Sequence, residues 1–138
     1  MNAVFCLALG YLFGSIPTAY LVGKMTKGID MRLQGSGNVG ATNVFRVVGK
    51  KWGIAVLLID MLKGFIPAFF LPRFCGPVLS SMFIPSLLAG IAAVAGHTWT
   101  PWLGFRGGKG VATSLGVLIA LAPKAAGIGM CIWIALCF

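Results

Sequence analysis

A glycine-rich segment between two apolar stretches carries the first side chains suited to chemistry. It reads GSGNVGATN from residue 35 to residue 43, and Arg46 follows it. Three glycines over six residues permit positive φ and bring backbone N–H groups together into a nest that suits an oxyanion. Hydroxyl, amide and guanidinium donors come from Ser36, Asn38, Thr42, Asn43 and Arg46. We interpret this segment as an anion-binding loop; the alternative is an ordinary polar connector.

A second polar segment, residues 97–110, has the same character. Its cations, Arg106 and Lys109, lie among glycines, and an apolar stretch follows directly. The glycines are Gly107, Gly108 and Gly110. A helix N-terminus exposes unsatisfied N–H groups and a partial positive charge, which suits phosphate. It is not a nucleotide-binding P-loop, because Lys109 is followed by glycine and no strand precedes it.

His97 is the one histidine of the chain and begins this second segment. Two interpretations stay open: a hydrogen-bonded structural residue, or a group that donates to a phosphate oxygen or assists proton transfer. A Ser-His-Asp triad is not expected, because Asp30 belongs to another loop and Asp60 to an apolar stretch. With one histidine, two Asp and no Glu, a carboxylate-rich metal site is not expected. The four cysteines form no CxxC pair and are expected to be small apolar fillers of helices.

The elements that must position these loops are strongly apolar. Of 138 residues, 59% are hydrophobic and 9% are charged, and the mean hydropathy is +0.98. Soluble domains carry about a quarter charged residues, so this composition excludes a water-soluble globule and a disordered tail. We predict an all-α integral membrane protein, a polytopic helical bundle of about five membrane helices. The apolar stretches are 3–23, 52–72, 76–96, 111–122 and 125–138, of which the last two are two short helices or one kinked helix.

The charges indicate both a class of partner and an orientation. Eleven Lys or Arg face two Asp, which gives a formal net charge of +9. Nucleic acid would need a soluble basic face that this chain has too little soluble mass to build, so phosphate-bearing small molecules or lipids are the expected partners. Eight of the eleven cations lie in residues 24–51 and 97–110, whereas Arg73 and Lys124 lie on the other side. By the positive-inside rule, both glycine-rich loops face the cytoplasm and the N-terminus lies outside.

Two charged residues interrupt the stretch 52–72. Asp60 and Lys63 are three residues apart and therefore share one face of a helix. Because unpaired charges are costly in hydrocarbon, we expect them to pair or to face the interior of the bundle. An ion pair that orients this helix is the favoured interpretation, and a direct role at a substrate site is the alternative.

The segments at 35–46, 96–97 and 104–113 together resemble the bacterial membrane acyl-phosphate:glycerol-3-phosphate acyltransferases. GSIPTAY at 14–20 and DMLKG at 60–64 also look like the first and second helices of that family, so the resemblance covers nearly the whole chain. It implies transfer of a fatty acyl group from acyl phosphate to the 1-hydroxyl of glycerol 3-phosphate. The products would be 1-acylglycerol 3-phosphate (lysophosphatidic acid) and phosphate, in phospholipid biosynthesis. The resemblance also implies a multi-pass protein of the bacterial cytoplasmic membrane that uses no metal or organic cofactor.

The same resemblance implies roles for the polar residues. Acyl phosphate is assigned to the first loop, at Ser36, Gly37, Asn38, Gly40, Thr42 and Asn43. Glycerol 3-phosphate is assigned to Arg46, Arg106, Gly107, Gly108, Lys109 and Gly110. The catalytic candidates are His97, Lys109 and Arg46, and His97 is expected to support the acyl-phosphate pocket. Membrane lipid is a further partner; nucleic acid is not, and the oligomeric state stays open.

Family members continue past this point with a third motif, so we expect residues 1–138 to be a single transmembrane acyltransferase domain that is C-terminally incomplete. The second candidate function is a non-enzymatic membrane anion carrier or channel for phosphate. A carrier would want polar residues or broken helices near the middle of the bilayer. A purely structural subunit would leave the two glycine-rich loops unexplained.

Overall fold

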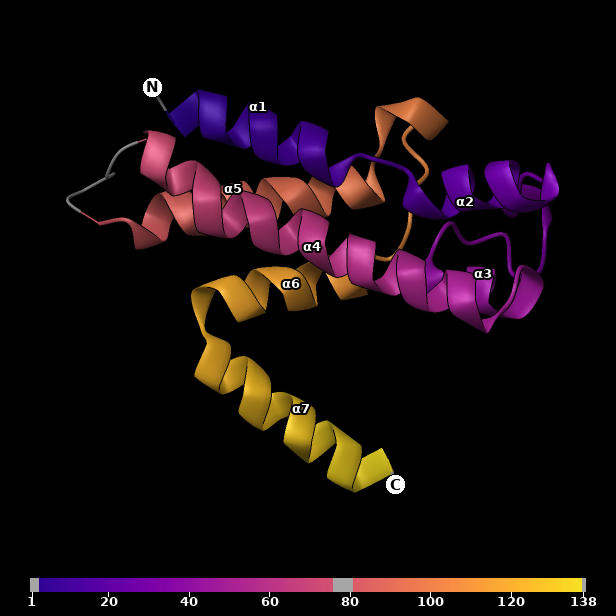
Figure 1. The fold of residues 1–138 in the computed structure, drawn as a ribbon. Helices are drawn as coiled ribbons and strands as arrows, with labels where there is room; N and C mark the ends of the chain where they lie inside the picture. The colour runs from indigo at the N-terminus through magenta and orange to yellow at the C-terminus, as the bar shows by residue number, and fades with distance from the viewer. Residues whose placement is uncertain (1–2, 76–80, 138) are drawn as a thin grey trace.

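The computed structural model describes residues 3–75 and 81–137, which form helices joined by short loops (Figure 1). The elements are α1 (Ala3–Gly14), α2 (Thr18–Lys27), η1 (Met31–Leu33), α3 (Ala41–Val47), α4 (Lys50–Cys75), α5 (Phe83–Thr98), η2 (Pro101–Leu103), α6 (Val111–Leu121) and α7 (Pro123–Cys137). Helices α1, α4 and α5 lie side by side, α6 packs against α4, and α7 projects away from the bundle. The predicted all-α bundle is confirmed.

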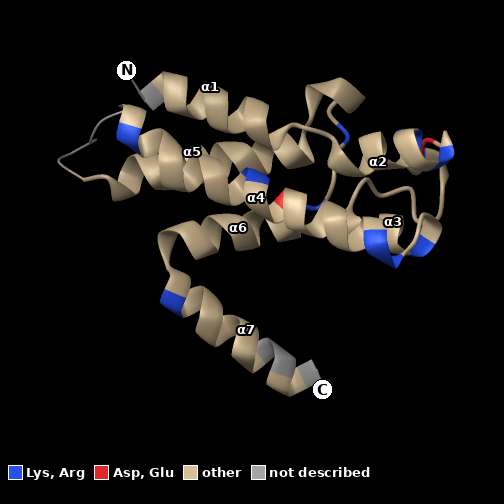
Figure 2. Ribbon diagram, in the orientation of Figure 1, with Lys and Arg blue, Asp and Glu red and all other residues tan. Residues whose placement is uncertain are grey.

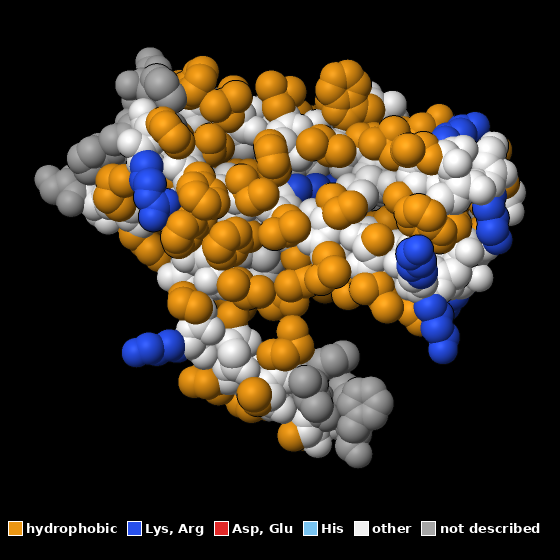
Figure 3. All heavy atoms as spheres, in the orientation of Figure 1, with side chains coloured by type: hydrophobic (Ala, Val, Ile, Leu, Met, Phe, Trp, Pro, Cys, Tyr) orange, Lys and Arg blue, Asp and Glu red, His pale blue; other side chains and the backbone are white. Residues whose placement is uncertain are grey.

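Three segments of the described chain are long and apolar enough to cross a membrane: Val4–Lys27, Lys50–Phe74 and Phe83–Leu103. Val111–Leu121 is a shorter apolar helix, and α7 has 15 residues, fewer than the about 20 that a crossing needs. Apolar side chains are spread over the helices of the bundle on the face drawn in Figure 3, as expected for a surface in contact with lipid. The number of about five crossings therefore stays a prediction.

Glycines allow the helices of the bundle to approach one another closely. A Cβ at Gly14 of α1 would collide with the backbone of Ala93 in α5. A Cβ at Gly64 of α4 would collide with the carbonyl oxygen of Thr113 in α6, and one at Gly116 would meet α4 in the same way. Small residues at helix interfaces are the usual means of close packing in membranes, where burial from water does not drive association.

The first apolar stretch, expected as one helix over 3–23, is broken into α1 and α2 at Ser15–Pro17. Pro17 has no N–H and disfavours helical geometry before it, so carbonyl groups near it lose their helical partners. Side chains from elsewhere replace those partners. The Ile16 carbonyl accepts from Lys63 Nζ at 2.9 Å, and the Ser15 carbonyl accepts from Thr100 Oγ1 at 2.6 Å. A broken backbone in a bundle is stable when neighbouring groups satisfy it in this way.

Residues 24–51, expected as a polar loop, are partly helical: they contain η1, α3 and the adjoining ends of α2 and α4. A small apolar core explains why this segment is partly helical. Its buried members are Ala19, Met31, Val39, Val44, Val56 and Leu103. Gly28, with φ +67°, ends α2 in the left-handed conformation that glycine adopts without strain. The first loop is thus supported by this small apolar core.

The remaining stretches agree with the predicted helices in part. The third helix begins at Phe83, and residues 76–80 of its expected range lie outside the described residues. Stretches 111–122 and 125–138 form two separate helices, α6 and α7, with a non-helical Ala122 between them. The two-helix interpretation is therefore confirmed over residues 111–137.

Lys and Arg gather where α2, α3 and the start of α4 lie together (Figure 2). The end of α4 carries Arg73, and the start of α7 carries Lys124. The charge asymmetry expected from the sequence is therefore present in the folded molecule. The orientation relative to the membrane, with the N-terminus outside, stays a prediction.

The cysteine expectation needs one correction. Cys6 is buried in α1 and is disulfide-bonded, so it is not merely an apolar filler. Cys131 in α7 is exposed and free. The side chains of Cys75 and Cys137 lie outside those that the structure describes.

Candidate active site

The side chain of Asn43 stabilises the shape of the first glycine-rich loop. Its side chain is buried, its Oδ1 accepts from the Ser36 N–H at 3.0 Å, and its Nδ2 donates to the carbonyls of Gln34 (2.9 Å) and Asn38 (3.0 Å). Gly35 has φ +58°, and a Cβ there would collide with Asn43 Oδ1. The predicted glycine-dependent turn is present, and the amide hydrogens of Asn43 are committed to the loop's own carbonyls.

The other polar side chains of the first loop face outward. Ser36, Thr42 and Arg46 are exposed, whereas Asn38 is half-buried and its Oδ1 has no hydrogen-bond partner among the described residues. Thr42 and Arg46 lie one turn apart on α3 and line a groove of about 300 Å³ against α4. The first loop therefore presents hydroxyl and guanidinium donors on an accessible surface.

The second loop is bound to the end of α5 by its backbone. The N–H of Gly107 donates to the Thr98 carbonyl at 2.9 Å, and the N–H of Gly108 donates to the His97 carbonyl at 3.1 Å. A Cβ at Gly107 would collide with that His97 carbonyl, so this approach requires glycine. Gly110, with φ +76°, is the N-cap residue of α6, which confirms that the loop leads directly into a helix. Arg106 and Lys109 are exposed.

The two loops meet at His97. Its ring is 7% exposed. Gly108 lies between that ring and the first loop: a Cβ on it would collide with His97 Nε2 and lie 2.9 Å from the carbonyl oxygen of Val39. A cavity of about 10 Å³ between the loops, enough for about one water, is lined by Val39, Gly108, His97 and Lys63 among others. Both predicted anion-binding loops therefore lie in contact at one end of the bundle.

Asp60 lies beside His97, which corrects the expectation that no acid would do so. Asp60 Oδ1 is 3.9 Å from His97 Nδ1 and 2.8 Å from Lys63 Nζ. The side chains of Asp60 and Lys63 are each 3% exposed. The expected ion pair on α4 is confirmed. Asp60 was expected to lie far from His97 because one belongs to a membrane helix and the other begins a loop. The two are neighbours because α4 packs against the end of α5.

Several supporting contacts were not foreseen. Tyr11 donates to the Trp99 carbonyl at 2.6 Å, and the Trp102 indole donates to Ser15 Oγ at 3.0 Å. Together with Thr100 they fasten residues 99–102 to the break between α1 and α2. The interruption at Ser15–Pro17 was the available signal, because a broken membrane helix must find hydrogen-bond partners elsewhere.

The acid nearest the first loop is already neutralised. Asp30 accepts from Arg32 Nη2 at 2.7 Å and from the Arg32 N–H at 2.9 Å, and these bonds lower the pKa of Asp30 to about 2. Lys27 Nζ donates to the Val47 carbonyl at 2.7 Å, which ties α2 to α3. The exposed cations near the loops therefore meet no free carboxylate within the described chain, and an anionic ligand is favoured there.

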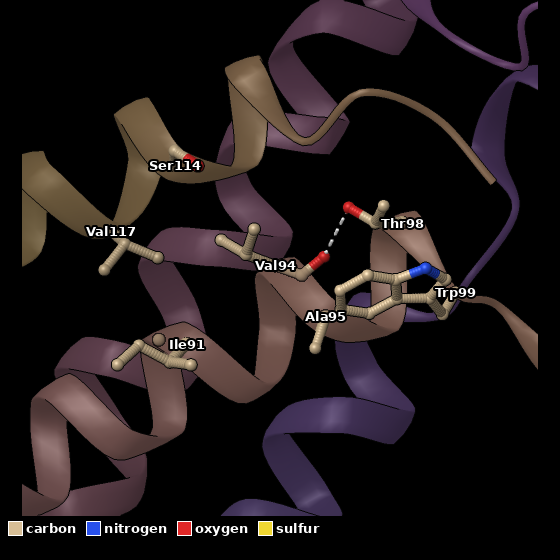
Figure 4. Close-up of a pocket in the computed structure, with 8 residues that line it drawn as sticks. Ile91, Val94, Ala95, Thr98, Trp99, Ser114 and Val117 are labelled. Atoms are coloured by element: carbon tan, nitrogen blue, oxygen red, sulfur yellow. Dashed lines mark hydrogen bonds between the residues drawn. The ribbon is translucent and has the colours of Figure 1, made fainter.

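An apolar groove of about 350 Å³ runs between α5 and α6 (Figure 4). Its lining includes Ile91, Val94 and Val117, and it ends at Thr98 and Trp99. A Cβ at Gly110 would lie 3.2 Å from Thr98 Oγ1. The groove therefore reaches the second loop, and its lining suits an alkyl chain.

The chain is similar to known acyltransferases over nearly its whole length. The family described as "Glycerol-3-phosphate acyltransferase" matches residues 4–138. A glycerol-3-phosphate acyltransferase of Desulforudis audaxviator is 47% identical over 98% of this chain and 65% of its own length. One of Geobacter metallireducens is 51% identical over 88% of this chain and 60% of its own. The chain thus spans 60–65% of the length of these two curated relatives, which is less than two thirds.

Two solved structures have the same fold. They are crystal structures of PlsY (YgiH), described as an integral membrane glycerol 3-phosphate acyltransferase, in its glycerol 3-phosphate and lysophosphatidic acid forms. Their TM-scores are 0.85 and 0.82, at 43% and 42% identity, and each match covers 97% of this chain and 64% of the other. The chain belongs to the glycerol-3-phosphate acyltransferase family.

Proposed function

We propose that this chain transfers a fatty acyl group from acyl phosphate to the 1-hydroxyl of glycerol 3-phosphate. The observation that carries this proposal is the contact between two glycine-rich, cation-bearing loops at Gly108, beside an apolar groove. Family membership supports it, as do the glycerol 3-phosphate and lysophosphatidic acid forms in which the solved relatives are described. The products are 1-acylglycerol 3-phosphate and inorganic phosphate.

The chemistry needs little from the side chains. Acyl phosphate is an activated mixed anhydride, so the hydroxyl oxygen of glycerol 3-phosphate attacks its acyl carbon directly. The bond between that carbon and the phosphate oxygen breaks, and the leaving phosphate accepts the proton of the hydroxyl. No covalent acyl-enzyme is formed. The protein's contribution is to hold two phosphate-bearing substrates together and to screen their mutual repulsion.

The loops divide this binding. Acyl phosphate meets the first loop at Ser36, Asn38 and Thr42, with Asn43 holding the loop behind them. Glycerol 3-phosphate meets Arg46 and the loop from Arg106 to Gly110, where Lys109 directly precedes the N-terminus of α6. The guanidinium of Arg46 can form two parallel hydrogen bonds to one phosphate.

The acyl chain lies in the apolar groove between α5 and α6, which ends beside the second loop. In this proposal the protein lies in the bacterial cytoplasmic membrane with both loops on the cytoplasmic side. A soluble substrate such as glycerol 3-phosphate has access to the loops there. The excess of cations around α2, α3 and the start of α4 supports this orientation.

Phosphate release tests the proposal. The purified chain in a lipid mesophase should release phosphate from palmitoyl phosphate only when glycerol 3-phosphate is present, and lysophosphatidic acid should form in equal amount. Palmitoyl-CoA replaces palmitoyl phosphate as the control donor and should not serve. Equal use of the two donors, or release independent of glycerol 3-phosphate, would show that the proposed reaction is wrong.

A further inference from the structure

Three buried polar side chains lie together where α4 packs against the end of α5, and substrate binding does not explain all of them. Lys63 Nζ contacts two acceptors, Asp60 Oδ1 at 2.8 Å and the Ile16 carbonyl at 2.9 Å. The same Asp60 oxygen is 3.9 Å from His97 Nδ1. All three side chains are at least nine-tenths buried. Burial of this kind is costly unless each group has a defined partner.

The charges in this trio favour a neutral imidazole. The single carboxylate of Asp60 is already paired with the ammonium of Lys63, so a second positive charge on His97 would have no counter-ion within the trio. A neutral imidazole has one N–H donor and one acceptor nitrogen. Nδ1 lies 3.9 Å from the carboxylate oxygen, which is longer than a hydrogen bond, and the negative charge of the carboxylate favours the hydrogen on this nitrogen.

The opposite side of the ring faces the loops. A Cβ at Gly108 would collide with His97 Nε2, and Gly108 also donates its N–H to the His97 carbonyl at 3.1 Å. Nε2 therefore lies against the backbone of the second loop at Gly108, and Gly108 in turn adjoins the carbonyl of Val39 in the first loop. An orientation imposed at Nδ1 is transmitted directly to the surface where the loops meet.

We propose that Asp60 is a positioning residue that fixes the tautomer of His97, with the hydrogen on Nδ1 and the acceptor Nε2 turned toward Gly108. Lys63 pairs with Asp60 and links it to the break between α1 and α2 through the Ile16 carbonyl. The trio thereby sets the position of the second loop relative to the first. The kinetic consequence rests on the proposed function, whereas the tautomer does not.

Nitrogen NMR tests the tautomer without interference, because His97 is the one histidine of the chain. The chain is labelled with imidazole-¹⁵N histidine, carries an affinity tag without histidine, and is measured without substrate at pH 7. We expect a protonated, pyrrole-type signal for Nδ1 and an unprotonated, pyridine-type signal for Nε2. A hydrogen on Nε2, or on both nitrogens, overturns the proposal whatever the variants do.

The matched variant is Asp60→Leu with Lys63→Met, which removes both charges at similar volume and leaves no unpaired buried ion. Its spectrum should shift toward the Nε2–H tautomer, which imidazole prefers in water. Asp30→Asn is the control, because it removes the chain's other carboxylate from an exposed pair, and it should leave the spectrum unchanged. A double variant with the wild-type tautomer would show that Asp60 does not orient His97.

Kinetics test the consequence separately. The double variant should raise KM for glycerol 3-phosphate by about tenfold, with a smaller effect on KM for acyl phosphate, whereas Asp30→Asn should change neither. Equal changes in both constants would contradict a role through the second loop. Absence of acyl transfer in the wild type would refute the proposed function but would leave the tautomer result standing.

Discussion

Asn43 and Arg46 belong to one short helix, α3, and meet different surroundings. The Asn43 amide is buried under the first loop and bonded to its backbone, whereas the Arg46 guanidinium is exposed beside Thr42. Asn43, which shapes the loop, and Arg46, which is proposed to bind a ligand, cannot be told apart in the sequence, because both are polar and both belong to the same motif. Their burial separates them.

Removal of the cations assigned to phosphate should abolish turnover selectively. Arg46→Ala and Lys109→Ala should each lower kcat/KM by about 100-fold or more, because each removes a charge aimed at developing negative charge. Lys50→Ala is the control: it deletes an exposed cation at the start of α4, near Arg46 in sequence. The assay is lysophosphatidic acid formation. Wild-type rates in both site variants would refute the two-phosphate arrangement.

The exposed pair Asp30–Arg32 predicts an acid sensitivity. The pKa of Asp30 lies at about 2 in the folded chain and at 3.8 for an unperturbed group, so the pair favours folding above pH 3.8. That contribution should disappear as the pH falls from 3.8 to 2.

Thermal unfolding in detergent at pH 5 and pH 2 measures this effect. The decrease in Tm on acidification should be smaller for Asp30→Asn than for the wild type. An identical decrease in the two proteins would show that the pair does not contribute to folding.

At the scale of elements, the close contact between α4 and α6 fixes the position of the second loop. Gly64 and Gly116 face each other's helices across the α4–α6 interface, and α6 begins directly after the second loop. The position of that loop therefore depends on how closely α6 can approach α4.

Gly116→Ala should destabilise the bundle by about 1–3 kcal/mol, because the added methyl group meets the carbonyl of Met61 and the helices must separate. Gly127→Ala in α7 is the matched control, since nothing lies within 4 Å of the added Cβ. Chemical unfolding in detergent measures both. Equal stability of the two variants would mean that the α4–α6 contact is less tight than described.

Sequence reasoning was most successful where one stretch of chain decides the structure. The glycine turn at Gly35, the helix that begins directly after Gly110, and the Asp60–Lys63 pair three residues apart are local features and were predicted correctly. The position of Asp60 beside His97 depends on how α4 packs against α5, and no spacing in the sequence encodes that. The break at Ser15–Pro17 was visible as an interruption, but its partners Lys63 and Thr100 come from distant segments.

At the scale of the whole molecule, the charge distribution and the loop contact support one face as the site of the proposed reaction. The loops touch at Gly108, so a single side of the membrane must hold both. The predicted side is the cytoplasmic one, because most cations lie near this end.

Labelling with a membrane-impermeant maleimide tests this topology. Cysteines introduced as Ser36→Cys and Phe105→Cys, in a chain whose own cysteines are replaced by serine, should react in inverted vesicles and not in intact cells. Arg73→Cys, at the far end of α4, should show the opposite pattern. Reaction of Ser36→Cys and Phe105→Cys from opposite sides would contradict a shared site.

The most direct test of the reaction follows the oxygen of the attacking hydroxyl. Glycerol 3-phosphate labelled with oxygen-18 at its 1-hydroxyl is incubated with unlabelled acyl phosphate and the chain, and the products are analysed by mass spectrometry. We predict that the label is retained in the ester of 1-acylglycerol 3-phosphate and that the released phosphate is unlabelled. A labelled oxygen bonded to the phosphorus of acyl phosphate, or no acylated product, would contradict direct acyl transfer between substrates held by the two loops.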